Sequence, residues 1–201
     1  MIAVITGDII KSQNSNTDQW LKDLKNLLSQ WGESPATWEI YRGDEFQIKT
    51  SIDDVFQKFL AIKSLIKSQE NLDVRIAIGI GEEQFCSDKI TESNGTAYVY
   101  SGKLLTELKA QGKTIAIKTP VDQLNHDLNL VLKWSALHFD TLTNAVSEVI
   151  FQHIINSDIT QEDLARKLNI SQSSVSQRIK RANLDLIKET NYYFQKKIAN
   201  L

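Results

Sequence analysis

Cysteine is almost absent from this chain of 201 residues, and its scarcity excludes one way of stabilising a fold. Cys86 is the only cysteine, so no internal disulfide can form and a reducing compartment is the natural setting. With eight glycines and two prolines, long disordered tails are not expected. The sequence lacks the roughly 20 consecutive apolar residues of a membrane span, and no charged leader precedes Ile2. A cytoplasmic protein without a membrane segment is therefore predicted.

Charge of one sign is also lacking, since the formal net charge is −2. The charge is nevertheless uneven, because residues 160–199 contain eight Lys or Arg and only four Asp or Glu. A locally basic segment on an acidic protein is typical of a DNA-binding element. The alternative interpretation is a solvated helix face, and charge by itself does not separate the two.

Hydrophobic periodicity predicts an alternation of strands and helices in the first part of the chain. The predicted order is β-α-β-β-α-β-α-β, which favours one sheet with helices packed on it. Gly79 and Gly81 are expected to end the fourth strand. The predicted strands cover 2–6, 37–41, 46–50, 74–80 and 114–118, and the predicted helices cover 18–31, 53–67 and 96–109.

Strand signals stop at Pro120. Beyond it the pattern predicts helices over 122–134, 141–156 and most of the remainder, with a break at 169–171. Two domains are therefore expected, 1–119 and 120–201, in an α+β fold whose second domain is entirely helical. The four tryptophans are expected in the core: Trp20, Trp31, Trp38 and Trp134.

Asp8 and Asp44 are the candidate ligand-binding residues of the first domain. Asp8 ends a strongly apolar run, and Asp44 lies at a tight turn between two predicted strands. If these strands are neighbours, the two carboxylates meet at one end of the sheet. Two such acids suit a divalent cation that carries a nucleotide phosphate. The alternative is structural, with Asp8 capping the following turn and Asp44 a plain hairpin acid.

Four segments around these acids resemble the palm-like catalytic domain that class III nucleotidyl cyclases share with diguanylate (GGDEF-type) cyclases. They are 6–12, 41–46, 74–81 and 95–104, and they occur in the family's order. The resemblance covers roughly residues 1–119 and implies a ferredoxin-like sheet. It also implies that Mg²⁺ or Mn²⁺ is held by Asp8, Asp44 and the carbonyl of Ile9. The implied nucleotide-binding residues are Ile10, Lys11 and Ser12, through their backbone amides, together with Arg42 and Lys103.

Two positions depart from the cyclase pattern. Val99 stands where cyclases place a transition-state Asn, and Lys103 replaces an Arg. Lysine keeps the positive charge but lacks the planar guanidinium group of arginine, and the valine side chain cannot donate a hydrogen bond. Losing one electrostatic donor costs ~3–4 kcal/mol of transition-state stabilisation. Nucleotide binding is therefore favoured over efficient cyclisation.

Residues 160–181 have the pattern of a helix-turn-helix. Thr160 is expected to cap the first helix, and Ser171 the second. Asn169 stands where a left-handed turn residue is usual, and asparagine tolerates that conformation. Leu164, Leu168, Ile170, Val175 and Ile179 are expected to face inward, beside the small Ala165.

The outer face of the second helix combines short polar side chains with cations. Ser and Gln can read base edges, while Lys and Arg contact phosphates. The pattern resembles bacterial transcription regulators, in which this helix enters the major groove. The alternative is a helix pair used only for packing or dimerisation. The residues expected to contact DNA are Gln172, Ser173, Ser174, Ser176, Gln177, Lys180 and Arg181.

The palm-like N-terminal part and the C-terminal helix-turn-helix together are similar to SatD-type bacterial proteins, over nearly the whole chain. The leading hypothesis is a DNA-binding transcription regulator, dimeric, whose first domain binds a metal with a nucleoside triphosphate or cyclic nucleotide. The first alternative is a metal-dependent nucleotidyl cyclase or related phosphoryl-transfer enzyme with a helical accessory domain. The second is an interaction domain in which the acids are structural.

Overall fold

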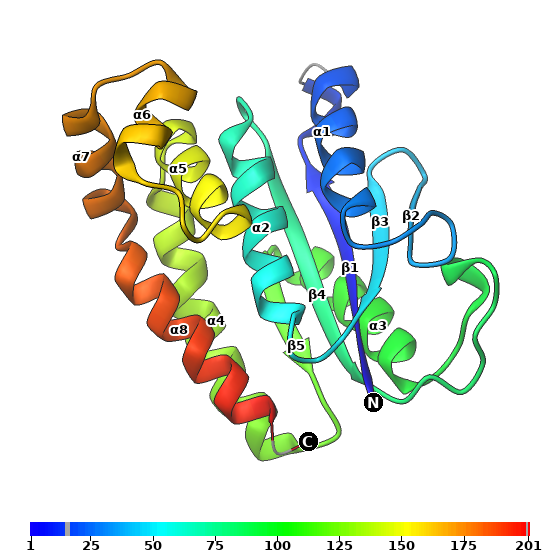
Figure 1. Ribbon diagram of the computed structural model, residues 1–201. Helices are drawn as coiled ribbons and strands as arrows, with labels where there is room; N and C mark the ends of the chain where they lie inside the picture. Colours follow the sequence, from blue (N-terminus) through cyan, green and yellow to red (C-terminus); the bar gives the residue numbers. More distant parts are fainter. Residues whose placement is uncertain (15–16, 200) are drawn as a thin grey trace.

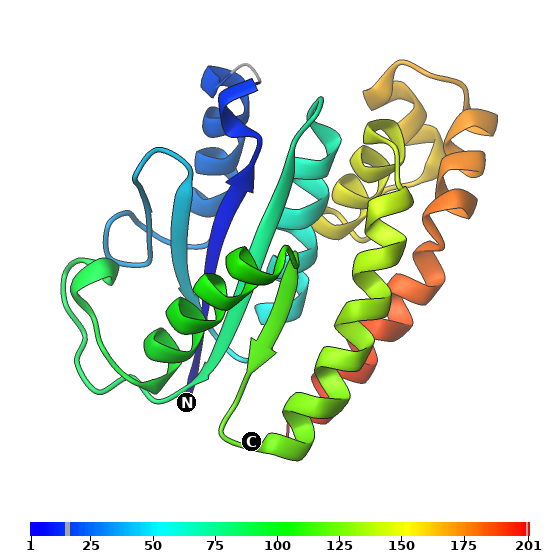
Figure 2. The same cartoon turned by 180° about the vertical axis from the view of Figure 1, so that it is seen from behind.

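The computed structural model describes residues 1–14, 17–199 and 201. It is an α+β protein in which, over these residues, one five-stranded mixed sheet is combined with eight α-helices. Figures 1 and 2 show the sheet between helices, with a further layer of helices at one side. The predicted order of strands and helices is confirmed. The strands are β1 (Ile2–Ile10), β2 (Trp38–Tyr41), β3 (Glu45–Thr50), β4 (Asp73–Gly81) and β5 (Ile115–Lys118).

The helices begin and end within a few residues of the predicted bounds in most cases. The 122–134 helix is the main exception, because it continues for two more turns. The helices are α1 (Thr17–Ser29), α2 (Val55–Ser68), α3 (Thr96–Gln111), α4 (Asp122–Thr141), α5 (Asn144–Ile155), α6 (Gln161–Leu168), α7 (Gln172–Ala182) and α8 (Leu184–Ile198).

The strands lie in the order β2-β3-β1-β4-β5. All neighbouring strands are antiparallel except β4 and β5, which are parallel. The central strand β1 is paired on both sides, so its polar C-terminal end lies between β3 and β4. This placement brings residues from three strands together at one end of the sheet.

Alternation along β1 decides which side chains each layer of helices covers. Ala3, Ile5 and Ile9 face the main core, which α1 and α2 close with Trp20, Leu24, Phe56 and other apolar residues. Val4 and Thr6 face the opposite side, where α3 lies. Asp8 has the same parity as Val4 and Thr6, so its carboxylate is directed to the α3 side.

Gly81 ends β4 as expected, but the expectation for Gly79 was wrong, because the strand continues past it. The glycine has a packing role instead. A Cβ built on Gly79 would lie 2.1 Å from the carbonyl oxygen of Ala97 and 2.6 Å from the amide nitrogen of Ser101. Glycine is needed here because the backbone of α3 lies directly on the strand.

The free edge of β5 is covered by two asparagines of α4. Asn129 accepts a hydrogen bond from the amide of Ile117 at 2.9 Å and donates one to its carbonyl at 2.8 Å. Asn125 pairs in the same way with Thr119, at 2.6 and 3.0 Å. The two side chains, one helical turn apart, take the place of a neighbouring strand and tie α4 to the sheet.

The main core continues without a break across Pro120. Leu128 and Leu132 of α4, Ile150 of α5 and Phe194 of α8 belong to the same buried cluster as the strands. The ring of Phe194 stacks on Phe56 of α2, with centroids 4.3 Å apart. The helices after Pro120 therefore pack against α2. The predicted domain boundary after residue 119 stays a prediction.

Trp134 departs from the expected tryptophan core. Trp20 and Trp38 are buried and Trp31 packs against the core, but Trp134 is 69% exposed. Its helix turns Leu128 and Leu132 inward, which directs position 134 away from the sheet. In the described part of the chain, no helix combines the length and the apolar character that crossing a bilayer requires.

Candidate functional site

The segments that contain Asp8 and Asp44 lie side by side at one end of the sheet, and the meeting of their two carboxylates stays a prediction. Asp8 is the register partner of Glu45, the residue that follows Asp44. The amide of Ile9 donates to the carbonyl of Asp44 at 3.0 Å, which fixes the hairpin turn against β1. Because the amide and carbonyl of one residue point to the same side in an antiparallel strand, the carbonyl of Ile9 also faces the turn.

Asp8 lies in a network of opposite charges. An oxygen of Asp8 lies 2.5 Å from a guanidinium nitrogen of Arg75, its register partner on β4. Its other oxygen lies 3.1 Å from the Lys109 ammonium of α3. Lys109 also contacts Glu45 at 2.8 Å. The Asp8 side chain is only 13% exposed, so two cations neutralise a carboxylate that has little access to water.

Lys109 of α3 contacts carboxylates on two strands, Asp8 of β1 and Glu45 of β3. Burial by itself would lower the pKa of its amine, but hydrogen bonds to Glu45 and Asp8 raise the pKa above its usual value. The ammonium therefore stays charged throughout the physiological range. It occupies the position between two carboxylates where a cation is most stabilised.

A metal ion at this site would have to compete with these side chains. Asp8 already has a cationic partner on each oxygen, and one oxygen of Asp44 accepts a hydrogen bond from the Ser12 hydroxyl at 2.9 Å. Among the described residues, no three acidic, histidine or cysteine side chains form a group that could hold a metal. The residues as arranged do not fit a resident metal without a rearrangement of Lys109 or Arg75.

The other residues implied by the cyclase resemblance lie at different distances from this network. Ile10, Lys11 and Ser12 form the end of β1 and the turn after it, with Lys11 in a left-handed conformation at φ 65°. Arg42 lies exposed in the hairpin turn at φ 53°. Lys103 does not join the network, because it lies exposed on the outer side of α3.

Arg75 and Lys109 were not expected at the site. Arg75 could have been noticed in the sequence, because it is the only cation in the apolar stretch 74–80. Such a cation needs a counter-charge, and Asp8 is the acid that ends the other apolar run. Lys109 left none, because its contact with Asp8 depends on how α3 crosses the sheet. Val99 is also exposed on α3, away from Asp8.

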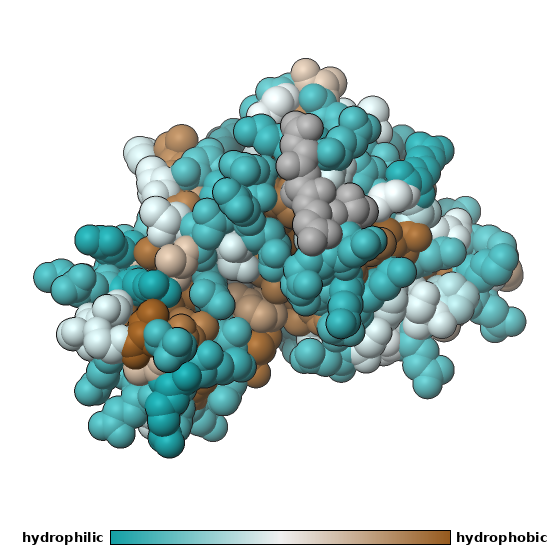
Figure 3. All heavy atoms as spheres, turned by 90° about the horizontal axis from the view of Figure 1, so that it is seen from above, coloured by the Kyte–Doolittle hydropathy of each residue, from teal (hydrophilic) through white to brown (hydrophobic). Residues whose placement is uncertain are grey.

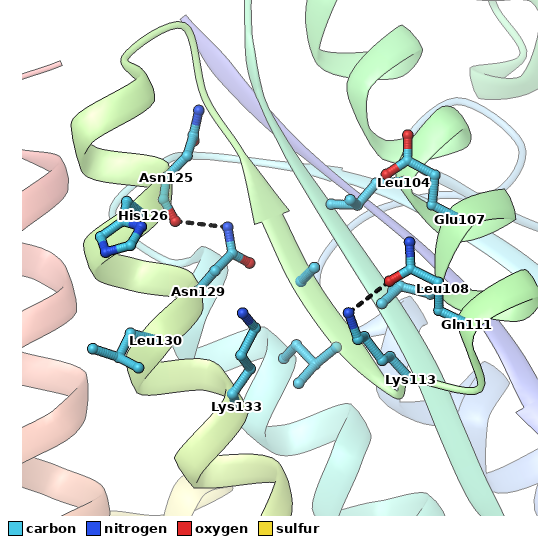
Figure 4. Close-up of a pocket in the computed structure, with 12 residues that line it drawn as sticks. Leu104, Glu107, Leu108, Gln111, Lys113, Asn125, His126, Asn129, Leu130 and Lys133 are labelled. Carbon is cyan, nitrogen blue, oxygen red and sulfur yellow. Dashed lines mark hydrogen bonds between the residues drawn. The ribbon is translucent and has the colours of Figure 1, made fainter.

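A separate cavity of about 330 Å³ lies between α3 and α4, beside the edge of β5. Figure 4 shows Glu107, Gln111 and Lys113 on one side of it, facing Asn129 and Lys133 on the other. Lys113 donates to Gln111 at 2.6 Å, and Asn129 is held by the backbone of β5 and α4. The cavity is open and mixed in polarity, and it adjoins the acidic end of the sheet, since Arg75 donates a hydrogen bond to the carbonyl of the lining residue Lys113 at 3.1 Å.

The helices α5, α6 and α7 form a small unit with a core of its own. Val149 of α5, Leu164 and Ala165 of α6 and Val175 of α7 are buried together. The turn residue Asn169 is left-handed at φ 52°, as expected. The partly buried Leu168, Ile170 and Ile179 complete the cluster, so the inward-facing residues predicted for 160–181 are confirmed.

Capping side chains fix both helix starts. The Thr160 hydroxyl accepts a hydrogen bond from the amide of Asp163, and the Ser171 hydroxyl accepts one from the amide of Ser174, both at 3.1 Å. The Ser174 hydroxyl lies 2.8 Å from that of Ser171, and Ser174 is half-buried. Ser174 therefore belongs to the cap, on the margin of the outer face.

The outer face of α7 is polar and cationic. Lys180 and Arg181 are exposed, and within the described chain neither makes an ion pair. Figure 3, seen from above, shows mainly hydrophilic residues over this end of the molecule. The remaining predicted contact residues on this face are also exposed: Gln172, Ser173, Ser176 and Gln177.

The architecture therefore defines an α+β protein with a mixed sheet, an ion-paired acidic cluster at one end of it, and a capped helix pair carried on a helical layer. A comparison with curated proteins returned no match. The chain matches the SatD family over residues 1–199 and belongs to that family.

Proposed function

We propose that this SatD-family protein is a cytoplasmic DNA-binding transcription regulator and that residues 160–181 are a helix-turn-helix. The observation that carries the proposal is the α6–α7 pair. Its turn is left-handed at Asn169, its second helix is capped by Ser171, and its outer face presents cations without intramolecular partners among the described residues. The alternative, a helix pair used only for packing or dimerisation, also leaves this face exposed, and the binding assay below separates the two.

The proposed role of each residue on α7 follows from its position along the helix. Gln172, Ser173, Ser176 and Gln177 occupy the first half of the helix, which in this motif contacts base edges. Lys180 and Arg181 occupy the last turn, where they reach phosphates. Phosphate contacts supply affinity and salt dependence, whereas the amide and hydroxyl side chains supply sequence preference.

Fluorescence anisotropy with genomic fragments tests this proposal. We expect log K to fall linearly with log salt, with a slope reduced by about 0.9 for each phosphate contact removed. Lys180→Ala/Arg181→Ala should therefore reduce the slope by about 2. The matched control is Lys22→Ala/Lys25→Ala, which removes two exposed cations from α1. Absence of salt-sensitive binding by the full chain, with or without nucleotide, would refute the proposal.

We further propose that residues 1–119 form a ferredoxin-like domain related to the cyclase palm, which senses a nucleotide. The strand order β2-β3-β1-β4 and the intervening helices support this relation. Asp8, Asp44 and the carbonyl of Ile9 are the proposed contacts for Mg²⁺ or Mn²⁺, which would supply charge neutralisation for phosphates. Because Lys109 and Arg75 neutralise Asp8 without ligand, binding would have to redirect at least one of these cations.

Titration calorimetry with ATP, GTP and cyclic nucleotides, each with Mg²⁺ or Mn²⁺, tests the sensor. Asp44→Asn removes charge at the turn and should abolish binding, while Asp23→Asn on α1 serves as the control. If wild-type protein releases no heat with any of these ligands, the sensor proposal is wrong, and DNA binding then stands or falls on its own assay.

The alternative function is a nucleotidyl cyclase or related phosphoryl-transfer enzyme. The acids at one end of the sheet support it, but Val99 and the outward Lys103 place no donor near Asp8. Incubation with ATP or GTP and Mn²⁺ separates the two functions. Product that disappears in both Asp8→Ala and Asp44→Ala would favour the enzyme.

A further inference from the structure

The helix α4 has two apolar faces, and only one of them is used by the fold. Leu128, Leu132 and Phe139 face the core. On the opposite side, Leu130, Trp134 and Leu137 follow one another at spacings of four and three residues, and they are 53%, 69% and 59% exposed. The outer face of a helix on a monomeric domain is normally polar. A second stripe at helical spacing indicates a helix that packs on two sides.

The stripe lies beside an apolar groove. The helices α4 and α8 run antiparallel, with His138 Nε2 2.9 Å from the carbonyl oxygen of Ala182 at one end and Lys197 3.3 Å from Asp127 at the other. Around the first of these contacts lies a cavity of about 580 Å³, and Trp134 lines one side of it. Its floor includes Phe56 and Leu60 of α2, and its walls include Leu137, His138, Leu186 and Thr190.

We propose that this surface joins two copies of the chain in a symmetric dimer, with α4 packed antiparallel on α4 of the second copy. The surface is complementary to itself, since it combines a projecting Trp134 with an adjacent groove. In a two-fold interface each protomer offers the same patch, so each tryptophan can enter the groove of the other copy. The proposal does not depend on DNA or nucleotide binding.

Charge sets the register of the two helices. Lys133 and Asp140 are exposed and lie seven residues apart on the same flank of the stripe. Within the described ranges neither makes an ion pair, and Asp140 acts only at longer range on Lys63, whose pKa it raises. In an antiparallel pair, equal flanks face each other. A two-fold axis midway between positions 133 and 140 therefore places each Lys133 opposite Asp140 of the second copy. It also places the two Leu137 side chains together at the axis.

The amount of apolar surface suits this partner. The exposed parts of Leu130, Trp134, Leu137 and Leu186 amount to on the order of 400–500 Å². A standard interface buries about 800 Å² on each partner, so these residues form its centre and the charged flanks its rim.

The same axis suits a DNA-reading dimer. Ala182, where α7 ends, contacts His138, one residue beyond Leu137. The 11 residues of α7 span about 16 Å. The dimer would therefore bring the C-terminal ends of the two α7 helices near its two-fold axis, and a two-fold regulator places its paired DNA-reading helices one turn of the major groove apart.

Sedimentation equilibrium on the full chain, without DNA or nucleotide, tests the dimer. Wild-type protein should be dimeric at micromolar concentration. Trp134→Glu should raise the dissociation constant about 1000-fold, because the symmetric interface loses a central tryptophan twice. Tyr192→Glu is the matched control, an exposed aromatic on the far side of α8 that should leave the dimer intact. Circular dichroism should show both variants folded.

Charge reversal tests the register. Lys133→Glu and Asp140→Lys should each weaken the dimer, and the double variant should restore it. In a Cys86→Ser background, a short bis-maleimide should join two copies through Leu137→Cys but not through Gln123→Cys. A wild-type chain that is monomeric at 100 µM, or a dimer insensitive to Trp134→Glu, would overturn the proposal. Failure of the double variant to restore dimerisation would overturn the register.

Discussion

The buried ion pair between Lys63 and Asp73 joins α2 to the start of β4. The Lys63 ammonium lies 2.5 Å from an oxygen of Asp73, and its side chain is only 2% exposed. The other oxygen of Asp73 lies 3.1 Å from Lys67, and the amide of Val74 donates to the carboxylate at 2.7 Å. Lys63 also donates a hydrogen bond to the carbonyl of Val74 at 3.4 Å.

Asp73→Asn should destabilise the protein by about 3–5 kcal/mol at pH 7, because it leaves an ammonium in the core without its counter-charge. This is a large part of the 5–15 kcal/mol that holds a typical domain folded. Lys63→Met/Asp73→Asn should recover most of the loss, since the buried charge is removed as well. Urea unfolding followed by circular dichroism measures both.

The pH dependence provides a second readout. Burial lowers the pKa of the Lys63 amine, and the attraction of Asp73 only partly offsets this effect. In Asp73→Asn that offset is lost, so the pKa of Lys63 falls further below the unfolded value of 10.5. The unfolded state then binds more protons than the folded state, and stability rises with pH. Asp73→Asn should therefore regain stability as the pH rises toward 10.5, by more than the wild type gains.

Two results would refute this reasoning. One is an Asp73→Asn variant within 1 kcal/mol of the wild type at pH 7, and the other is an identical pH slope in the two proteins. The control is Lys67→Met, which removes the second cation from the same carboxylate. It should cost less than about 1 kcal/mol, because Asp73 keeps its stronger partner.

Three further perturbations have defined outcomes. Asn129→Ala should cost about 2 kcal/mol in urea unfolding, because it leaves the amide and carbonyl of Ile117 without partners; a change below 0.5 kcal/mol would contradict this. Lys109→Met frees one oxygen of Asp8 and should tighten Mn²⁺ binding in calorimetry, whereas unchanged or absent binding would argue against a metal at Asp8. Burial and Lys188 lower the pKa of His153, so the folded state resists protonation and stability should fall as pH drops below about 6.5. His153→Gln should flatten this fall, and an equal fall in both proteins would exclude the histidine as its source.

Local structure was predictable where neighbouring residues decide it. Asn169 predicts a left-handed turn and Ser171 a helix cap, because each acts on backbone groups within three residues. The apolar spacing in α6 and α7 likewise predicts the inward faces that the core confirms. The helix bound at 134 was less predictable, because the last turns of α4 are held by distant segments, with Phe139 packed on Phe59 of α2 and His138 bonded to Ala182 of α7.

The acidic end of the sheet was predictable only in part. A strand that ends in Asp8 and a hairpin that turns at Asp44 need only pair as neighbours for the two segments to meet, and they do. The cations around Asp8 could not be read from the chain. Lys103 and Lys109 lie on the same helix, and the choice between them depends on the close crossing of α3 over β4 that Gly79 permits.

The sequence by itself therefore determined the order of elements, the capped helix pair with its cationic outer face, and the end of the sheet where the acids lie. These features depend on periodicity and on contacts between near neighbours in the chain. Only the tertiary structure decided that Lys109 and Arg75 neutralise Asp8, that two asparagines close the edge of β5, and that Trp134 faces outward. Each of these depends on the angle and depth at which distant segments pack, which no short stretch of sequence records.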